Sequence, residues 1–443
     1  MNNNGNANNN NASNANGVRP ISTVRLKDTR SFHTEERRDC PSMENIVNTR
    51  HDAGGYDQSG YKHVIYDGNV LYEAFLKAKK GSDWKGSVQR FEMDYLFGLA
   101  KIQKELQEET YRFKEGSSFI IRERGKVRKI TGEKIDDRIV KHALCDEVIN
   151  PAIKKYLIHD NGASQVGKGI EFTRRRLEQH LHQYYRRNGT NKGYILIMDF
   201  SKYYDNIRHD VVRDMMKKYI DNPYALRLID KVLESERVDV SYMTEEEYGS
   251  CMEDVFDSLK YFDIQSEKLT GKKYMEKHMN IGNQVAQSVG ISYRIPFDNF
   301  FKIVKGFDSY AAYMDDSYAI HESKEFLEEA LGESIDVAKS IGITVNLKKT
   351  RICKLSDMWR FLQIQYSLTD TGRVIHKINP KRLTVMRRKM KKLSGCLTEK
   401  EFSNLYHSWF NSYSRYMSKK QRENMDILYE DIKTKHYKRR RTC

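Results

Sequence analysis

Two short runs of the chain place carboxylates directly after apolar residues. Tyr194–Met198 is the most apolar short run in the sequence, and Asp199 follows it. Tyr310–Met314 is a similar run, and Asp315 and Asp316 follow it. Hard Mg²⁺ ions prefer oxygen ligands, and two such ions about 3.5–4 Å apart can hold the attacking and leaving oxygens of a nucleotidyl transfer. The sequence therefore predicts a metal-binding carboxylate site at the ends of two strands.

An adjacent Asp pair is, by itself, more often a solvated turn than a metal site. The context favours the metal site, because like charges at the end of an apolar hairpin repel each other and a bound cation relieves that repulsion. The hairpin is predicted to continue through Tyr318–Ile320 after the turn at Asp315 and Asp316.

Helices and strands are predicted to alternate around these carboxylates, which indicates an α+β fold. Short β-prone runs between turn signals predict buried strands, and apolar residues at helical spacing predict helices. The predicted strands are 194–198, 310–314 with 318–320, 343–353, and a hairpin at 117–130 around Gly125. The predicted helices are two within 69–108, one carrying Ile139–Leu144, one at 170–187 and one at 324–341.

The charge of the chain points to a polyanionic partner. The 443 residues include 77 Lys plus Arg and 61 Asp plus Glu, a net charge of +16, which favours nucleic acid. Residues 377–443 hold 19 Lys plus Arg against 6 Asp plus Glu, and so carry +13 of that charge. Leu383, Met386, Met390 and Leu393 predict a buried helix stripe, with Arg387, Arg388, Lys391 and Lys392 around it as candidate phosphate contacts. A solvated basic face is the alternative.

Membrane insertion and secretion are not expected. No run approaches the ~18 consecutive apolar residues that a spanning helix needs. Ten of the first 17 residues are Asn, which predicts a disordered polar tail over residues 1–20 and no signal peptide. The six cysteines lie more than forty residues apart, with no Cys-x-x-Cys pair, so we expect a reducing, cytoplasmic setting.

The carboxylate runs resemble motifs of the bacterial and phage reverse transcriptases. Tyr313–Asp316 resembles the Tyr-x-Asp-Asp box of that family, and Asp199–Asp205 resembles its first catalytic box. The resemblance implies that Asp199, Phe200, Asp315 and Asp316 hold two Mg²⁺ ions, with Mn²⁺ as a substitute ion. It also implies that Tyr204 is the aromatic gate that excludes a ribose 2′-hydroxyl, against the alternative of an ordinary core aromatic.

Four further segments carry the same resemblance in the family's order. Ile281–Gln287 is similar to a Gly-x-x-x-Ser-Gln box with Ala286 in place of Ser, and Asn346–Thr350 is similar to an Asn-x-x-Lys-Thr strand. Trp359–Gln363 resembles the primer-grip turn, with Gln363 in place of Gly, and Lys126–Ile130 resembles the triphosphate-binding strand. By this resemblance the site residues are Lys349 as proton donor to pyrophosphate; Lys126, Arg128 and Gln287 for the nucleotide; and Gly282, Tyr313, Met314, Phe361 and Leu362 for nucleic acid.

The resemblance implies a right-hand polymerase fold, with a palm built from an antiparallel sheet flanked by helices. The expected parts are an N-terminal segment and fingers at 21–190, a palm at 191–375 that includes an inserted segment at about 225–280, a helical thumb at 376–432 and a basic tail at 433–443. The acidic run Glu245–Glu247 indicates that the inserted segment binds a partner other than nucleic acid.

The implied activity is RNA-directed DNA synthesis, with an RNA template, a DNA or RNA primer and deoxynucleoside triphosphates. The Ala286 variant, the Lys168–Gly169 loop and Tyr406–Tyr413 are similar to enzymes of diversity-generating retroelements. That subgroup implies a structured non-coding RNA and a small accessory protein as further partners. The alternatives are a phage-defence reverse transcriptase, with templated or untemplated synthesis, and an RNA-binding maturase or scaffold without chemistry.

Overall fold

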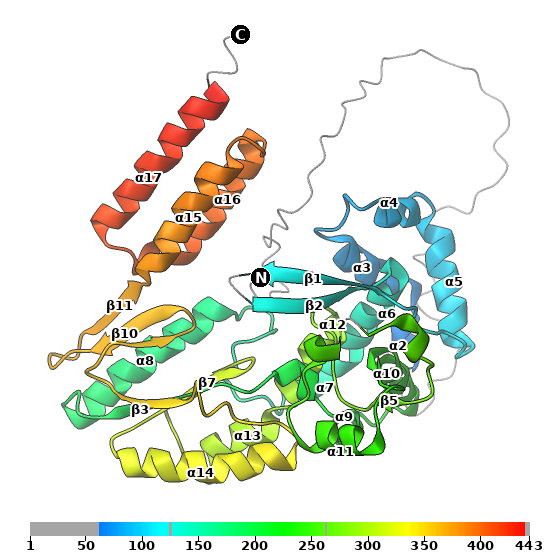
Figure 1. Ribbon diagram of the computed structural model, residues 1–443, viewed down its shortest axis with the longest axis horizontal. Coiled ribbons are helices and arrows are strands. Elements are labelled where there is room, and N and C mark those ends of the chain that lie inside the picture. Colours follow the sequence, from blue (N-terminus) through cyan, green and yellow to red (C-terminus); the bar gives the residue numbers. More distant parts are fainter. Residues whose placement is uncertain (1–61, 124–125, 262–263, 439–443) are drawn as a thin grey trace.

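The computed structural model describes residues 62–123, 126–261 and 264–438 of the chain (Figure 1). The tail predicted at 1–20 lies outside these residues. One hydrophobic core runs through the described part from Ile65 to Ile432. The fold is a mixture of helices and antiparallel strands, as the α+β prediction states.

The central sheet has four antiparallel strands in the order β6-β7-β3-β8. Their bounds are β3 Tyr194–Met198, β6 Tyr310–Tyr313, β7 Asp316–His321 and β8 Arg351–Lys354. Met198 pairs with Ser317, and Tyr313 pairs with Asp316 across the tight turn of the β6–β7 hairpin. Continuing the β3–β7 register by one residue sets Asp199 beside Asp316. The pairing of the strands therefore brings the two carboxylate runs to one edge of the sheet.

Two long helices cover opposite faces of this sheet (Figure 1). The helix α14 (Lys324–Ser340) packs on β3, β7 and β8, and α8 (Ile170–Asn188) packs on β6. The side chain of Ser323 caps α14 by accepting from the amide of Phe326 at 3.0 Å. Gly189 ends α8 at a φ of +64°, a left-handed conformation that costs glycine little. The two helices bury both faces of the sheet next to the carboxylates.

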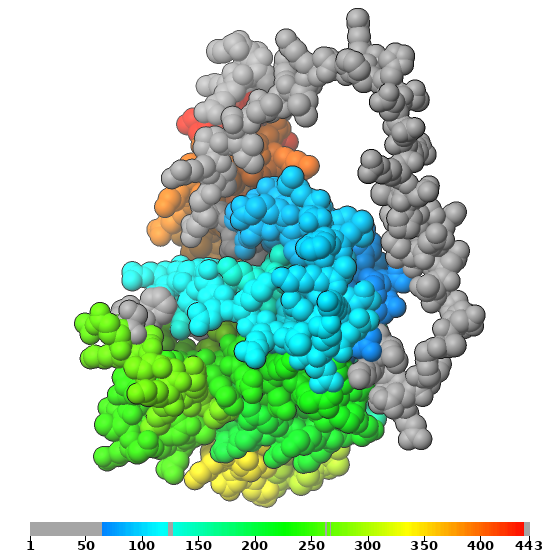
Figure 2. Space-filling view, turned by 90° about the vertical axis from the view of Figure 1, so that its right-hand side faces the viewer, coloured from blue at the N-terminus to red at the C-terminus, as the bar shows by residue number. Residues whose placement is uncertain are grey.

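Helices from two stretches of the chain, 62–154 and 209–299, and a β-hairpin complete the N-terminal and central parts of the fold. The hairpin is β1 Ser117–Glu123 and β2 Lys126–Gly132. The helices are α2 Lys62–Ile65, α3 Gly68–Lys79, α4 Gly86–Met93, α5 Tyr95–Gln107, α6 Ile135–Leu144, α7 Asn150–Lys154, α9 His209–Tyr219, α10 Pro223–Glu236, α12 Gln284–Ser292 and α13 Ile295–Asn299. Figure 2 shows the hairpin region in cyan directly above the green surface of residues 200–280.

Residues 237–280, which we call the insert, have a small core of their own. Val240, Met243, Phe256 and Met275 are buried together. Its elements are β4 Val238–Asp239, α11 Glu245–Glu253, β5 Tyr274–Met275 and the 3-10 helices η3 Ser258–Tyr261 and η4 Ser266–Lys268. The acidic helix α11 buries none of its residues. This small core is separate from the main one, whereas residues 225–236 of the segment predicted as an insertion lie in the helix α10, which packs in the main core.

The C-terminal part is a three-stranded sheet followed by three helices. The strands are β9 Trp359–Phe361, β10 Ile364–Leu368 and β11 Val374–Ile378, and the helices are α15 Pro380–Leu393, α16 Glu399–Tyr413 and α17 Lys419–Lys433. The helices lie side by side (Figure 1), and Tyr406 of α16 stacks on Tyr429 of α17 with ring centres 4.2 Å apart. Capping boxes at Thr398 and Ser418 begin α16 and α17.

Two predictions of local structure are wrong. The strand predicted at 343–353 is a strand only from Arg351, because residues before it cross the end of β3, where Val345 pairs with Phe200 alone. The region 69–108 contains three helices, because the chain breaks after Lys79 at Gly81 and again at Asp94. Among the described residues, none of the helices has the length and apolar character to cross a membrane.

Candidate active site

Asp199 is held at the end of β3 by residues from the loop before β8. The Nζ atom of Lys349 lies 2.6 Å from Oδ1 of Asp199, and Nδ2 of Asn346 donates to the same oxygen at 3.3 Å. The amide of Asn346 also donates to the carbonyl of Asp199 at 2.7 Å. The Lys349 side chain is 53% exposed and the Asp199 side chain is 15% exposed. The carboxylate is therefore recessed, and the ammonium reaches it from the solvent side.

Asp316 lies close enough to Asp315 and Asp199 for their charges to act on it. Burial, followed by the negative charges of those two residues, raises the pKa of the Asp316 carboxyl well above its usual value. The cations Lys349 and Arg294 oppose this shift. The structure thus brings the three predicted carboxylates together at a site with an excess of negative charge.

The donor chemistry of this cluster fits hard divalent cations. Carboxylate oxygens are the ligands that Mg²⁺ prefers, and a cation offsets repulsion between them. Among the described residues, no group of three or more His, Cys, Asp and Glu side chains has the geometry to hold an ion as it stands. The ammonium of Lys349 lies against Oδ1 of Asp199, so a cation bound at this oxygen would compete with it. The ring of Phe200 is 2% exposed and has no lone-pair donor, so only its carbonyl could serve as a ligand.

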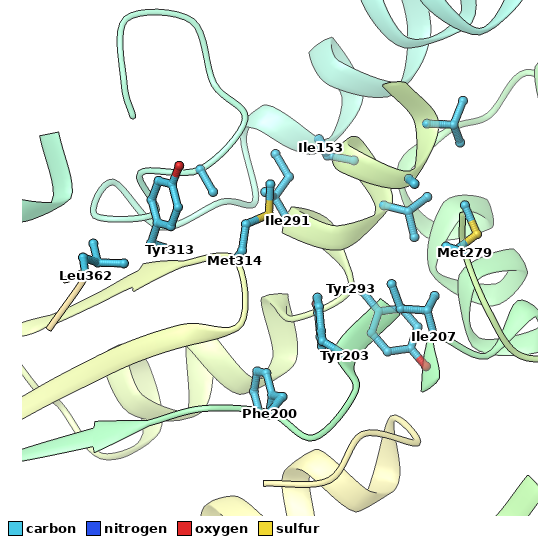
Figure 3. Packing of buried hydrophobic residues seen from close by; sticks show 14 of the residues in the cluster. Ile153, Phe200, Tyr203, Ile207, Met279, Ile291, Tyr293, Tyr313, Met314 and Leu362 are labelled. Atoms are coloured by element: carbon cyan, nitrogen blue, oxygen red, sulfur yellow. The ribbon is translucent and has the colours of Figure 1, made fainter. Parts of the chain in front are cut away.

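A buried arginine, Arg294, holds the turn that carries Asp315. Met314 has a φ of +54°, an unfavourable conformation for a side chain of this size. An Nη1–H of Arg294 donates to the carbonyl of Met314. Figure 3 shows Met314 pointing toward Ile291 of α12, with Phe200 and Tyr203 among the buried residues around the turn. The strained backbone at Met314 is therefore fixed by both packing and a charged donor.

Arg294 itself belongs to a buried network that our sequence analysis did not identify. Its Nε donates to Oδ1 of Asp298 at 2.9 Å, and its Nη2 donates to the Tyr310 hydroxyl at 3.1 Å. Tyr310 in turn donates to Asp298 at 2.7 Å. Arg294 and Asp298 are 0% and 1% exposed. The signal that could have revealed them is that this Arg and this Asp, four residues apart, are the only charged residues in the run 285–301.

Tyr204 lies beside the carboxylate turn. Its hydroxyl donates to Sδ of Met314 at 3.5 Å, and burial together with the charges of Asp315 and Tyr313 raises the pKa of the phenol. Gly290 of α12 makes room for it, because a Cβ there would lie 2.8 Å from the Tyr204 hydroxyl oxygen. Tyr204 is half-buried, so part of its ring remains accessible next to the carboxylates.

The segment with Gly282 and Gln287 leads into α12. Gly282 has a φ of +117° and is exposed, and Asn283 caps the helix by accepting from Ala286 at 2.6 Å. Gln287 is half-buried, and its Oε1 accepts no hydrogen bond from any described residue although it is shielded from solvent. An unsatisfied buried acceptor costs about 1–3 kcal/mol, so this oxygen is suited to a donor from a ligand.

Phe361 and Leu362 lie at the tight turn between β9 and β10. Phe361 is buried against the ring of Tyr318, and the carbonyl of Leu362 accepts from the buried Arg174 at 2.8 Å. Leu362 and Gln363 both have positive φ, as a two-residue hairpin turn requires. The side chains of both predicted residues are buried, as are those of Tyr313 and Met314.

The predicted basic residues other than Lys349 lie on the β1–β2 hairpin and on α15. Arg128 is half-buried in β2, opposite Ile121; the backbone of Lys126 belongs to the same strand, and its side chain lies outside the described part. The helix α15 buries Leu383, Met386 and Met390 as predicted, whereas Leu393, the fourth residue of the predicted stripe, is half-buried at the end of the helix. Arg388, Lys391 and Lys392 are exposed and Arg387 is half-buried, which places all four on the solvent side of this helix or its margin.

Comparison with known proteins identifies the region that contains this site. A family model described as reverse transcriptase (RNA-dependent DNA polymerase) matches residues 114–366, which is more than half of the chain. No curated protein matches the chain. A structure of telomerase from Candida albicans in complex with a fragment of telomeric RNA is similar, with 10% identity and a TM-score of 0.40. The match covers 74% of this chain and 59% of the telomerase chain, so this chain spans less than two thirds of that protein.

Proposed function

Because the chain belongs to the reverse transcriptase family of RNA-directed DNA polymerases, we propose that it extends a DNA or RNA primer on an RNA template by two-metal-ion nucleotidyl transfer. The observation that carries this proposal is the convergence of Asp199, Asp315 and Asp316 through the strand register, where burial and then the charges of Asp315 and Asp199 raise the pKa of Asp316. Two Mg²⁺ ions, when bound, would stabilise the attacking and leaving oxygens of the reaction. The carboxylates would hold these ions together with the carbonyl of Phe200.

The residues around the carboxylates supply the remaining roles. Lys349 stands at the exposed side of Asp199 and would donate a proton to the departing pyrophosphate. Tyr204 would contact the sugar of the incoming nucleotide from its place beside Met314. The unsatisfied oxygen of Gln287 would accept a hydrogen bond from nucleotide or primer-template. Lys126 and Arg128 would contact the triphosphate, because guanidinium and ammonium groups form charge-assisted hydrogen bonds with phosphate oxygens.

On this proposal, three parts of the chain correspond to the fingers, palm and thumb of a polymerase. Residues 21–190 include the fingers, 191–375 form the palm and 376–432 form the thumb. The basic side of α15, with Arg387, Arg388, Lys391 and Lys392, would follow the phosphates of the primer-template.

We further propose that this synthesis serves a diversity-generating retroelement. The support is the sequence of three segments: the Ala286 variant, the Lys168–Gly169 loop and Tyr406–Tyr413. This setting includes a structured template RNA and a small accessory protein. A phage-defence enzyme is the second candidate, because it would use the same carboxylate site.

Primer extension with sequenced products tests both levels of the proposal. The reactions contain Mg²⁺ and a mixed-sequence RNA template with a DNA primer, and parallel reactions lack template or use Asp315→Asn. Template-dependent product that is absent with Asp315→Asn supports an RNA-directed DNA polymerase. Errors confined to template adenines support the retroelement setting, whereas product without template contradicts it and favours the defence enzyme. Product that persists with Asp315→Asn contradicts the carboxylate assignment.

A further inference from the structure

The insert folds back onto the short segment that carries Tyr204. The 3-10 helix η2 (Tyr203–Asn206) follows Asp199 by a few residues, and Lys202 just before it has a φ of +46°. A lysine in this left-handed conformation is strained, and such strain persists only where neighbouring structure holds it. The Lys202 carbonyl accepts from Nδ2 of Asn206 at 3.0 Å, and Nζ of Lys202 lies 2.9 Å from Oδ1 of Asp257 in the insert.

Asn206 binds the insert backbone with both ends of its amide. Its Nδ2 donates to the carbonyl of Phe256 at 3.1 Å, and its Oδ1 accepts from the amide of the same residue at 2.8 Å. Asn206 is 2% exposed and Phe256 is 1% exposed. Buried hydrogen bonds of this kind are costly to break, because each broken bond leaves a polar group without water. This contact fixes the end of η2 two residues after Tyr204.

Asp205 binds two further points around the insert. Its Oδ1 accepts from the Ser258 hydroxyl at 2.8 Å and from Nδ1 of His278 at 3.0 Å. His278 has a φ of +105°, and its amide donates to the carbonyl of Ile207. The amide of the next residue, Met279, donates to the carbonyl of Tyr204 itself at 2.9 Å. Backbone and side-chain contacts therefore hold η2 from two parts of the insert, one around Phe256 and Ser258 and the other at His278 and Met279.

Further hydrogen bonds connect His278 to the β1–β2 hairpin. Nε2 of His278 lies 3.2 Å from Oδ1 of Asn280, which accepts from the Thr131 hydroxyl of β2 at 2.9 Å. The 3-10 helix η3 of the insert packs on β2. Burial lowers the pKa of Lys129 in β2, and the negative charge of Asp205 partly offsets that effect. Figure 2 shows the two regions in contact. The insert thus joins the segment with Tyr204 to the strand with Arg128.

We propose that Asp205, Asn206, Phe256, Ser258 and His278, which we call the clamp, position Tyr204 and so set the preference for deoxyribonucleotides over ribonucleotides. This proposal rests on the proposed function, in which Tyr204 contacts the sugar. The clamp residues are positioning residues, because each acts through η2. The insert then has a role in selectivity that does not require a partner on its acidic helix α11.

The test measures the ratio of dNTP to rNTP incorporation, as kcat/KM for single additions to one RNA-templated primer. The variants are Asn206→Ala and Ser258→Ala, with Ser258→Thr as a rescue variant that keeps a hydroxyl. Glu245→Gln is the matched control, because it removes the exposed ion pair with Lys273 at 2.8 Å on the insert without touching the clamp. We expect the ratio to fall about two- to tenfold in the two Ala variants, the range that loss of one net hydrogen bond covers. Ser258→Thr and Glu245→Gln should keep the wild-type ratio.

Tyr204→Val in the same assay separates failure of this proposal from failure of the proposed function. A lowered ratio in Tyr204→Val with a wild-type ratio in both Ala variants overturns the clamp and leaves the gate in place. A wild-type ratio in Tyr204→Val overturns the gate. Equal loss of dNTP and rNTP incorporation in the Ala variants, with the ratio unchanged, shows structural support only and also overturns the clamp. If Asn206→Ala does not fold, Ser258→Ala and Ser258→Thr alone decide the result.

Discussion

Arg294 donates from Nη1 to the carbonyl of Met314, the residue directly before Asp315. The arginine is fully buried, and its charge is balanced by Asp298 at 2.9 Å. Burial and the neighbouring carboxylates raise the pKa of Asp316, and the positive charge of Arg294 partly offsets that increase. One side chain therefore holds the backbone of the turn before Asp315 and favours the ionised state of a carboxylate that the proposed reaction needs.

Arg294→Met should destabilise the protein strongly. It leaves Asp298 buried without its cation, which typically costs about 3–5 kcal/mol. The triple variant Arg294→Met/Asp298→Leu/Tyr310→Phe removes the whole network and should recover most of that stability, while synthesis stays reduced because Met314 has lost its donor. Urea unfolding and primer extension measure the two effects. Wild-type synthesis by the triple variant would show that Arg294 has no role in positioning the turn.

Lys349→Met should separate metal binding from turnover. The ammonium of Lys349 occupies Oδ1 of Asp199, so its removal should lower the Mg²⁺ concentration needed for half-maximal activity. Turnover should fall about 10²–10⁴-fold if the lysine is the proton donor, the usual contribution of a general acid. Titration of Mg²⁺ in steady-state primer extension reports both quantities. Turnover equal to that of the wild type would exclude Lys349 as the acid.

Tyr204→Val should admit ribonucleotides. The shorter side chain opens space beside Met314, and steric discrimination in such pockets is worth about 10- to 200-fold. Incorporation of rNTPs and dNTPs opposite the same template base measures the change, and Tyr203→Phe is a control for loss of a neighbouring hydroxyl. Selectivity equal to that of the wild type would mean that Tyr204 is only a core aromatic.

Gly290→Ala should displace the ring of Tyr204 by crowding its hydroxyl. The new Cβ would lie 2.8 Å from the Tyr204 hydroxyl oxygen, closer than carbon and oxygen tolerate, so the ring must shift. We expect a changed dNTP to rNTP ratio with primer-template binding unchanged. Gly332→Ala on α14, where a Cβ meets no neighbour, is the matched control. Equal ratios in the wild type and Gly290→Ala would argue against contact between Tyr204 and the sugar.

Replacing Arg387, Arg388, Lys391 and Lys392 with Gln should weaken primer-template binding. Each lost phosphate contact should reduce the slope of log K against log salt by about 0.7–0.9. Fluorescence anisotropy over a salt series measures the slope. The control variant Lys419→Gln/Lys420→Gln removes exposed charge from α17 instead. A slope that is unchanged in the α15 variant, or reduced as much in the control, would make this basic side an ordinary solvated surface.

The local parts of this site could be predicted from the sequence because strands and turns have short-range signals. The apolar runs before Asp199 and Asp315 predict two strands, β3 and β6, and the structure places β7 between them, with Met198 opposite Ser317. The stripe of Leu383, Met386 and Met390 predicts the buried side of α15 for the same reason.

The supporting parts depend on contacts between residues far apart in the chain. Arg294 reaches Met314 only after α12 and α13 pack under the β6–β7 hairpin, and no periodic pattern encodes that approach. Asn206 and Phe256 are fifty residues apart, and their hydrogen bonds require the insert to fold back on η2. The strand predicted at 343–353 is wrong for a related reason, because its first half is held by loop contacts with Asp199 and Ser201.

The most direct test of the central claim is single-nucleotide extension of a primer on a defined RNA template with Mg²⁺, comparing the wild type with Asp199→Asn and Asp316→Asn. The carboxylate assignment predicts that both variants lose extension while their affinity for primer-template, measured in the same buffer, stays within a few-fold of the wild type. Extension at wild-type rates by either variant would contradict the account, because the site would then do its chemistry without the carboxylates that define it.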